Sequence, residues 1–127
     1  MTALTQDRPA GGVQATAWVD VCRFDDLPTE RGVAVLVGDE QVALFRLADE
    51  SLAAVSNFDP FSSANVLARG IVGTRGGTPT LASPMYKQVF DLRTGRCLDN
   101  EDVCLQLYPT RVKAGGVLLG AVLLDPP

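Results

Sequence analysis

Apolar and polar residues alternate in short runs along most of the chain. Three runs rich in β-branched and other apolar residues lie at 33–38 (VAVLVG), 41–47 (QVALFRL) and 51–57 (SLAAVSN), and the polar sequences GDE and ADE separate them. This spacing is typical of β-hairpins, so we expect three antiparallel strands in a meander. No segment keeps the helical apolar period over three turns. The pattern therefore predicts an all-β domain.

Further strands are expected on both sides of this meander. WVDVCRF (18–24) predicts a first strand, and DDLPTERG (25–32) predicts the turn that follows it. The segments TLASP (80–84) and QVFDL (88–92) also have strand character. The final stretch, 105–124, predicts a strand, a break at a proline, a second strand, a Gly-Gly turn and a last strand.

Residues 58–80 interrupt the strand pattern, because they are rich in Gly, Ser, Thr and Pro. Irregular segments of this length in compact domains are usually functional or once were. The glycine-rich part, RGIVGTRGGTPT (69–80), lacks the Lys-Ser/Thr ending of a phosphate-binding loop, so a hairpin tip is favoured over a nucleotide site. DLRTG (91–95) predicts a tight turn in which Asp91 accepts hydrogen bonds from backbone amides and Gly95 takes a positive φ.

Composition narrows the possible partners. The chain of 127 residues is long enough for one domain with a core, which we place at 17–125 after a polar leader at 1–16. A net charge of −4 without a basic patch argues against nucleic acid. The apolar runs fall short of the roughly 20 residues that span a bilayer, and no signal-peptide pattern is present. We therefore expect a cytoplasmic protein.

The three cysteines are Cys22, Cys97 and Cys104. An odd number in a cytoplasmic chain argues against a disulfide framework, so we expect reduced and mostly buried side chains. A Cys97–Cys104 pair across a hairpin remains open at this level.

Two loops carry the most specific pattern in the chain. They read NFDPFSSA (57–64) and SPMYKQVFDLRTG (83–95). Together they resemble the two cluster-binding loops of the Rieske family, Asn-x-Cys-Pro-His and Cys-Pro-x-His followed by Phe-Asp-x-x-Thr-Gly. The resemblance implies an all-β Rieske-like domain with antiparallel sheets in a sandwich-like or barrel-like arrangement. It also implies an inserted two-loop subdomain, at about 57–95.

The positions that hold the cluster in that family carry other residues here. By the resemblance, Asp59 and Phe61 stand at the first Cys and His, and Ser83 and Tyr86 stand at the second pair. A Rieske centre needs two thiolates and two imidazoles, and the chain has no histidine. Oxygen donors suit a sulfide-bridged cluster poorly, and three cysteines are too few for an all-cysteine cluster or zinc site. We therefore expect no metal, cofactor or catalytic residue in this chain.

Without a metal, side chains must close the two loops. The aromatic rings of Phe61 and Tyr86 either meet at the tip in a cluster of their own or join the main core. The tip of a Rieske domain is also where partners dock. Aromatic residues and methionine suit a protein–protein contact, and a lysine can add a charged one. The candidate docking residues are Phe58, Phe61, Met85, Tyr86 and Lys87.

The longer blocks around the loops, 55–73 and 82–99, are similar to the small-subunit family of cytoplasmic NAD(P)H-dependent nitrite reductase. The resemblance implies a non-catalytic subunit that docks to a large subunit during nitrite reduction to ammonia in nitrate assimilation. FAD, sirohaem and a [4Fe–4S] centre would lie on that large subunit, with NAD(P)H as donor. Two alternatives stay open: a stand-alone interaction module on the same fold, and a Rieske-type ferredoxin, which the missing ligands disfavour.

Overall fold

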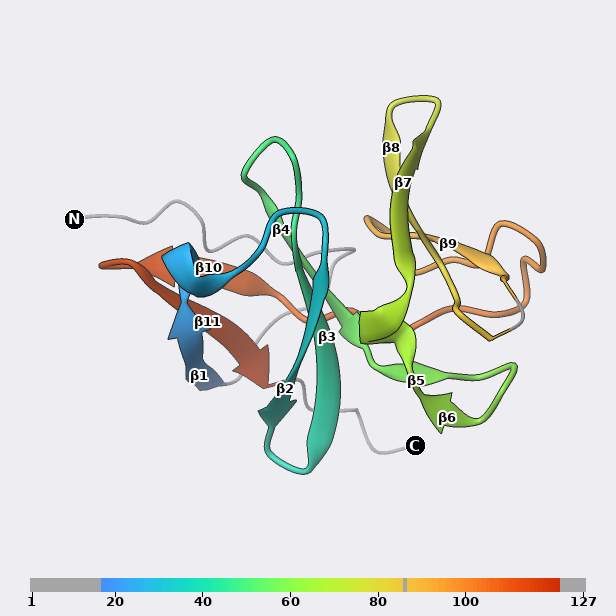
Figure 1. Ribbon diagram of the computed structural model, residues 1–127. Coiled ribbons are helices and arrows are strands. Elements are labelled where there is room, and N and C mark those ends of the chain that lie inside the picture. The colour runs from blue at the N-terminus through green and yellow to red at the C-terminus, as the bar shows by residue number, and fades with distance from the viewer. Residues whose placement is uncertain (1–16, 86, 122–127) are drawn as a thin grey trace.

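The computed structural model describes residues 17–85 and 87–121 (Figure 1). The predicted leader at 1–16, Tyr86 and residues 122–127 lie outside the described part of the chain. The described residues form antiparallel strands and two short 3₁₀ turns, η2 (Phe24–Asp26) and η3 (Leu67–Arg69), which confirms the predicted all-β class. No helix within this part of the chain is long and apolar enough to cross a membrane.

The strands form three sheets and one short hairpin. The first sheet has the order β1 (Ala17–Arg23), β11 (Gly116–Ala121), β10 (Thr110–Lys113). The second is the meander β2 (Gly32–Val37), β3 (Glu40–Arg46), β4 (Leu52–Ser56). The third has the order β7 (Ile71–Arg75), β8 (Thr78–Ala82), β9 (Val89–Asp91). The hairpin pairs β5 (Phe58–Asp59) with β6 (Ala64–Asn65).

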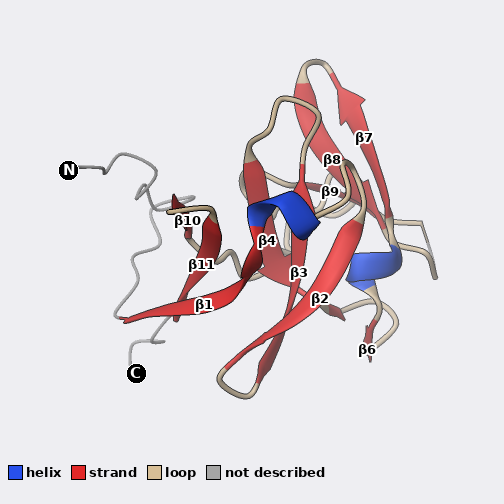
Figure 2. Cartoon of the chain, turned by 60° about the vertical axis from the view of Figure 1, so that its left-hand side comes forward, coloured by secondary structure: helices blue, strands red, loops and turns tan. Residues whose placement is uncertain are grey.

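The meander sheet lies between the other two sheets (Figures 1 and 2). Its central strand β3 is buried on both faces, which explains its almost continuous apolar run. Because side chains alternate across a strand, Val42 and Leu44 pack towards the β1-β11-β10 sheet, while Ala43 and Phe45 pack towards the β7-β8-β9 sheet. The domain therefore has two cores, one on each face of the meander.

Two sequence predictions need correction. The segment 105–108 is not a strand, because its contact with β4 is a single bridge between Val55 and Leu107. Residues 58–80 are not irregular throughout. They hold the β5–β6 hairpin, η3 and the paired strands β7 and β8, with the predicted hairpin tip at Gly76–Gly77.

The turn predicted at 91–95 is present in the structure. Asp91 Oδ1 accepts a 2.7 Å hydrogen bond from the Arg93 amide, and Gly95 has a φ of 80°, so the predicted turn is confirmed.

All three cysteines are free, and Cys97 is buried. The expectation of mostly buried thiols was wrong, since Cys22 is partly buried and Cys104 is exposed.

Candidate functional site

The first former cluster loop is fixed at its base by Asn57, a buried polar residue that directly follows β4. Its side-chain amide donates a 3.1 Å hydrogen bond to Oε1 of Gln41 on β3. Its side-chain oxygen accepts a 2.7 Å hydrogen bond from the backbone amide of Ala68 in η3. Asn57 thus ties the start of the loop to the meander and to the segment that leads into β7.

A direct hydrogen bond joins the two loops at the positions that hold cysteines in the Rieske pattern. The Ser83 hydroxyl donates a 2.5 Å hydrogen bond to Oδ2 of Asp59, and both residues are buried. The other carboxylate oxygen, Oδ1, accepts a 2.9 Å hydrogen bond from the backbone amide of Phe61. Hydrogen bonds to a carboxylate are stronger than those between neutral groups. This contact therefore closes the loops where two thiolates would otherwise bind one iron.

Sequence reasoning considered Asp59 and Ser83 only as unsuitable ligands and missed their contact with each other. The resemblance already placed them at equivalent positions of the two loops. Two cysteines bound to one iron must lie close together, so the residues that replace them could have been expected to meet. The residue types also pointed to this contact, because the serine hydroxyl can donate a hydrogen bond and the aspartate carboxylate can accept it.

The ring of Phe61 turns inward and packs against the main core. Its centroid lies 6.1 Å from that of Phe90, with 49° between the ring planes. Phe90 is fully buried in the core between the meander and the β7-β8-β9 sheet. Phe61 therefore joins the main core and does not form a separate aromatic cluster at the tip, which is the second of the two predicted alternatives. Tyr86, the other ring in that hypothesis, lies outside the described residues.

The second loop turns tightly between β8 and β9. The Ser83 amide donates to the Gln88 carbonyl at 2.9 Å, and the Lys87 amide donates to the Ser83 carbonyl at 3.1 Å. The Met85 amide donates a 3.2 Å hydrogen bond to Oγ of Ser83. Ser83 is thus bonded through both its backbone and its side chain, which holds the loop shut without a metal.

Apolar side chains on the outer surface of the two loops remain accessible. Phe58 is 44% exposed and Met85 is 51% exposed, although both are large and apolar. Lys87 of the second loop is also exposed. Of the predicted docking residues, the structure thus places Phe58, Met85 and Lys87 on the surface and Phe61 against the core. We call Phe58, Met85 and Lys87 the tip surface.

The chemistry of these loops does not fit a [2Fe–2S] cluster. The Asp59 and Ser83 oxygens are bonded to one another, and the Phe61 ring offers no lone pair. No group of three or more His, Cys, Asp or Glu side chains could hold a metal ion within residues 17–85 and 87–121. The histidines that complete a Rieske centre are absent from the whole chain.

Comparison with known proteins gives consistent matches. The family model described as a Rieske-like [2Fe-2S] domain matches residues 17–120. The NADH nitrite reductase small subunit of Escherichia coli K12 is 44% identical over 103 residues, which cover 80% of this chain and 95% of that protein. A Mycobacterium tuberculosis protein assigned as an NADH-dependent nitrite reductase small subunit has a crystal structure that superimposes with a TM-score of 0.81. Its sequence is 48% identical to this chain, and the match covers 85% of this chain and 97% of the Mycobacterium tuberculosis protein.

One further match is to part of a larger polypeptide. The NAD(P)H nitrite reductase large subunit of Klebsiella oxytoca is 38% identical over 115 residues. The match covers 91% of this chain and 12% of that large subunit. A segment similar to this chain is therefore built into the polypeptide of a large subunit.

Proposed function

Because this chain belongs to the Rieske-like family of nitrite reductase small subunits, we propose that it docks to the large subunit and does not itself carry electrons. The complex would reduce nitrite to ammonia with electrons from NAD(P)H. In this proposal FAD, sirohaem and a [4Fe–4S] centre belong to the large subunit, and the complex works in the cytoplasm.

The observation that supports docking without electron transfer is the Asp59–Ser83 hydrogen bond. Electron transfer by this fold needs a cluster between the two loops, and the loops are instead joined by two oxygen-bearing side chains. A buried carboxylate with two hydrogen-bond donors is satisfied in this arrangement and has no need of a metal ion. The loops keep their shape, and therefore the surface that they present, without the redox centre.

The partner is supported by the Klebsiella oxytoca match. Joining two interacting chains in one polypeptide keeps them at a high effective concentration without a new contact. A domain of this kind inside a large subunit is expected if the separate chains associate in other organisms. A stand-alone interaction module would give no reason for that arrangement.

The proposed docking site is the tip surface. Phe58 and Met85 are exposed apolar side chains on two loops that are held in one position by the Asp59–Ser83 contact. Aromatic and methionine side chains are enriched in protein interfaces, and a few of them commonly supply most of the binding free energy. Preformed loops also reduce the entropy cost of binding.

The test is to measure binding of Phe58→Ser/Met85→Ser to the purified large subunit by calorimetry, together with NAD(P)H-dependent nitrite reduction by the mixture. Truncating two central apolar residues is expected to raise Kd roughly 10- to 100-fold, because each contributes about 1 kcal/mol or more. The matched control is Leu36→Ser, since Leu36 is 63% exposed on β2 outside the two loops. Unchanged binding by the double variant would contradict docking through the tip.

A further inference from the structure

The charge of this chain is divided unevenly between the loop region and the rest. Residues 57–95 contain four cationic residues, Arg69, Arg75, Lys87 and Arg93, and two acidic residues, Asp59 and Asp91, which gives a net charge of +2. Since the whole chain carries −4, the remaining residues carry −6. The Asp59 carboxylate is buried and hydrogen-bonded, and the partly buried Asp91 carboxylate accepts hydrogen bonds from the Arg93 and Thr94 amides, so the fully exposed charged groups of this region are cationic.

A surface groove lies beside the loops, between the turn that precedes β2 and the segment from η3 into β7. It has a volume of about 490 Å³ and is lined by Glu30, Arg31, Gly32, Ala68, Arg69, Gly70, Ile71 and Val72. Ile71 is 72% exposed there, although it is a large apolar residue. The groove therefore combines an accessible apolar side chain with two arginines and a single carboxylate, that of Glu30.

Two glycines bring the walls of this groove together. A side chain on Gly32 would collide with the carbonyl oxygen of Ala68, so only glycine lets the start of β2 pack against η3. A side chain on Gly70 would likewise collide with the carbonyl oxygen of Ala82, next to Ser83. The groove is thus continuous with both loops, through η3 on one side and β8 on the other.

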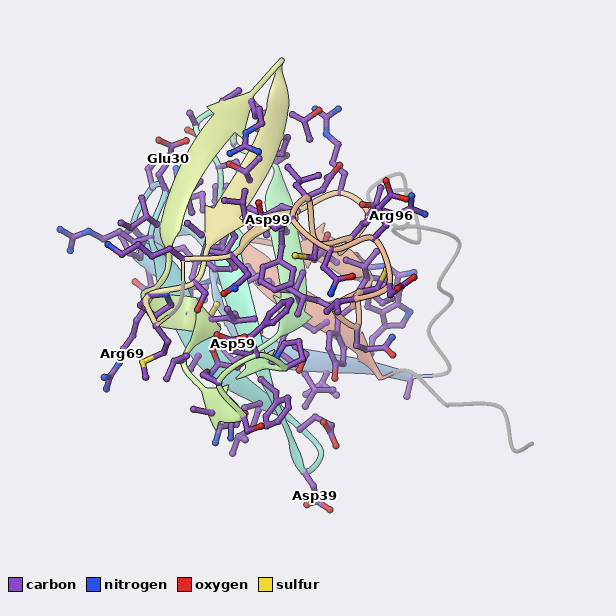
Figure 3. The ribbon with its side chains drawn as sticks, turned by 90° about the vertical axis from the view of Figure 1, so that its right-hand side faces the viewer. Glu30, Asp39, Asp59, Arg69, Arg96 and Asp99 are labelled. Atoms are coloured by element: carbon purple, nitrogen blue, oxygen red, sulfur yellow. The ribbon has the colours of Figure 1, made fainter. Side chains whose placement is uncertain are left out.

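The guanidinium groups of Arg31 and Arg69 have no hydrogen-bond or ion-pair partner within the described part of the chain. Arg31 and Arg69 make no ion pair or hydrogen bond to another described side chain, and both are exposed. Arg46, by contrast, pairs with Glu50 and also donates to the backbone carbonyl of Leu27. In Figure 3 the Arg69 side chain points outward, on the side of the molecule opposite Arg96. Two unpaired guanidinium groups beside an exposed isoleucine are well suited to bind a carboxylate-bearing segment.

We infer that this groove extends the docking surface and receives an acidic segment of the large subunit, with one of its apolar side chains packed on Ile71. The inference rests on the proposed function, because it takes the large subunit as the occupant. It adds the chemistry of the complementary surface: carboxylates that face Arg31 and Arg69, beside an apolar contact. Charges of this kind accelerate association and set its dependence on salt, more than they set the affinity at high salt.

The experiment measures association and dissociation rates of Arg31→Glu/Arg69→Glu with the purified large subunit at about 50 mM and about 500 mM NaCl, where screening lengths differ about threefold. We expect association to slow about tenfold at low salt and the difference from wild type to shrink at high salt. The matched control is Arg96→Glu/Lys113→Glu, which makes the same change in net charge at exposed residues outside the groove. Circular dichroism and Tm check that each variant is folded.

An unchanged association rate and salt dependence in Arg31→Glu/Arg69→Glu would overturn the inference, as would an equal effect of the control pair. The two sets of variants distinguish a failure of the groove contact from a failure of docking at the tip. If Phe58→Ser/Met85→Ser loses binding while the groove variant behaves as wild type, docking at the tip stands and the acidic contact is wrong. If only the groove variants are affected, including Ile71→Ser, the groove contact stands and docking at the tip is wrong.

Discussion

Replacing Ser83 by alanine removes the hydroxyl that donates to Asp59 and leaves the fully buried carboxylate with the Phe61 amide as its remaining donor among the described residues. A hydrogen bond to a charged group contributes about 1.5–3 kcal/mol, and a buried group that loses its partner also loses the compensation for its desolvation. We therefore expect Ser83→Ala to lower the free energy of unfolding by about 2–3 kcal/mol. For a chain of this length, that corresponds to a decrease in Tm of roughly 6–12 °C.

A double-mutant cycle separates this contact from other effects of the substitution. Asp59→Ala alone leaves the Ser83 hydroxyl without its acceptor, whereas Asp59→Ala/Ser83→Ala removes both partners. The double variant is expected to lose less stability than the sum of the single variants, by about 1–2 kcal/mol. Urea denaturation followed by circular dichroism gives each free energy, and hydrogen exchange of the Phe61 and Met85 amides reports whether the loops open locally.

Ser62 provides the matched control, because its hydroxyl oxygen is buried in the first loop, which also carries Asp59, and makes no hydrogen bond within the described part of the chain. Ser62→Ala removes an unsatisfied polar atom, so it is expected to leave stability unchanged or to raise it slightly. If Ser83→Ala stays within about 0.5 kcal/mol of wild type, as the control does, the contact does not hold the loops together and the reasoning fails.

Other substitutions and chemical probes test the rest of the structure. Gly95 and Gly77 both have positive φ, but a side chain on Gly95 would meet a backbone carbonyl at 2.5 Å while Gly77 faces open space. Gly95→Ala should therefore lower Tm clearly more than Gly77→Ala, and equal losses would contradict the packing of that turn. Iodoacetamide labelling followed by mass spectrometry should modify exposed Cys104 first and buried Cys97 only after unfolding. Burial and two nearby carboxylates raise the pKa of the Cys22 thiol, so its labelling should need higher pH than an ordinary thiol; rapid labelling of Cys22 at neutral pH would refute this.

Most of the strand pattern could be read from local sequence. Each strand of the meander is a short apolar run bounded by turn residues, and the central run is apolar at consecutive positions because both of its faces are covered. The segment at 105–108 misled this reasoning for a physical reason. Its apolar residues are buried, with Leu105 and Leu107 in one core and Tyr108 in the other, but it pairs with β4 through one bridge only. Because the segment is buried, it has the apolar composition of a strand, although it does not form a continuous series of hydrogen bonds with a neighbouring strand.

The loop region was harder to predict, because its contacts join residues distant in sequence. Glycine and proline in β7 and β8 weaken the local strand signal, although the pairing is regular from Ile71 opposite Ala82 to Arg75 opposite Thr78. The Asp59–Ser83 contact spans 24 positions and depends on the tertiary arrangement of the sheets. The absence of suitable cluster ligands, by contrast, could be read directly from residue types.

The most direct test of the central claim is reconstitution of nitrite reduction with a small subunit that contains no iron. The chain is unfolded, freed of metal with a chelator, refolded, and shown by elemental analysis to lack iron before it is added to the purified large subunit with NAD(P)H and nitrite. We predict the same activity as with the untreated small subunit, and a large decrease when the small subunit is omitted. Activity that returns only after iron and sulfide are restored to this chain would contradict the account.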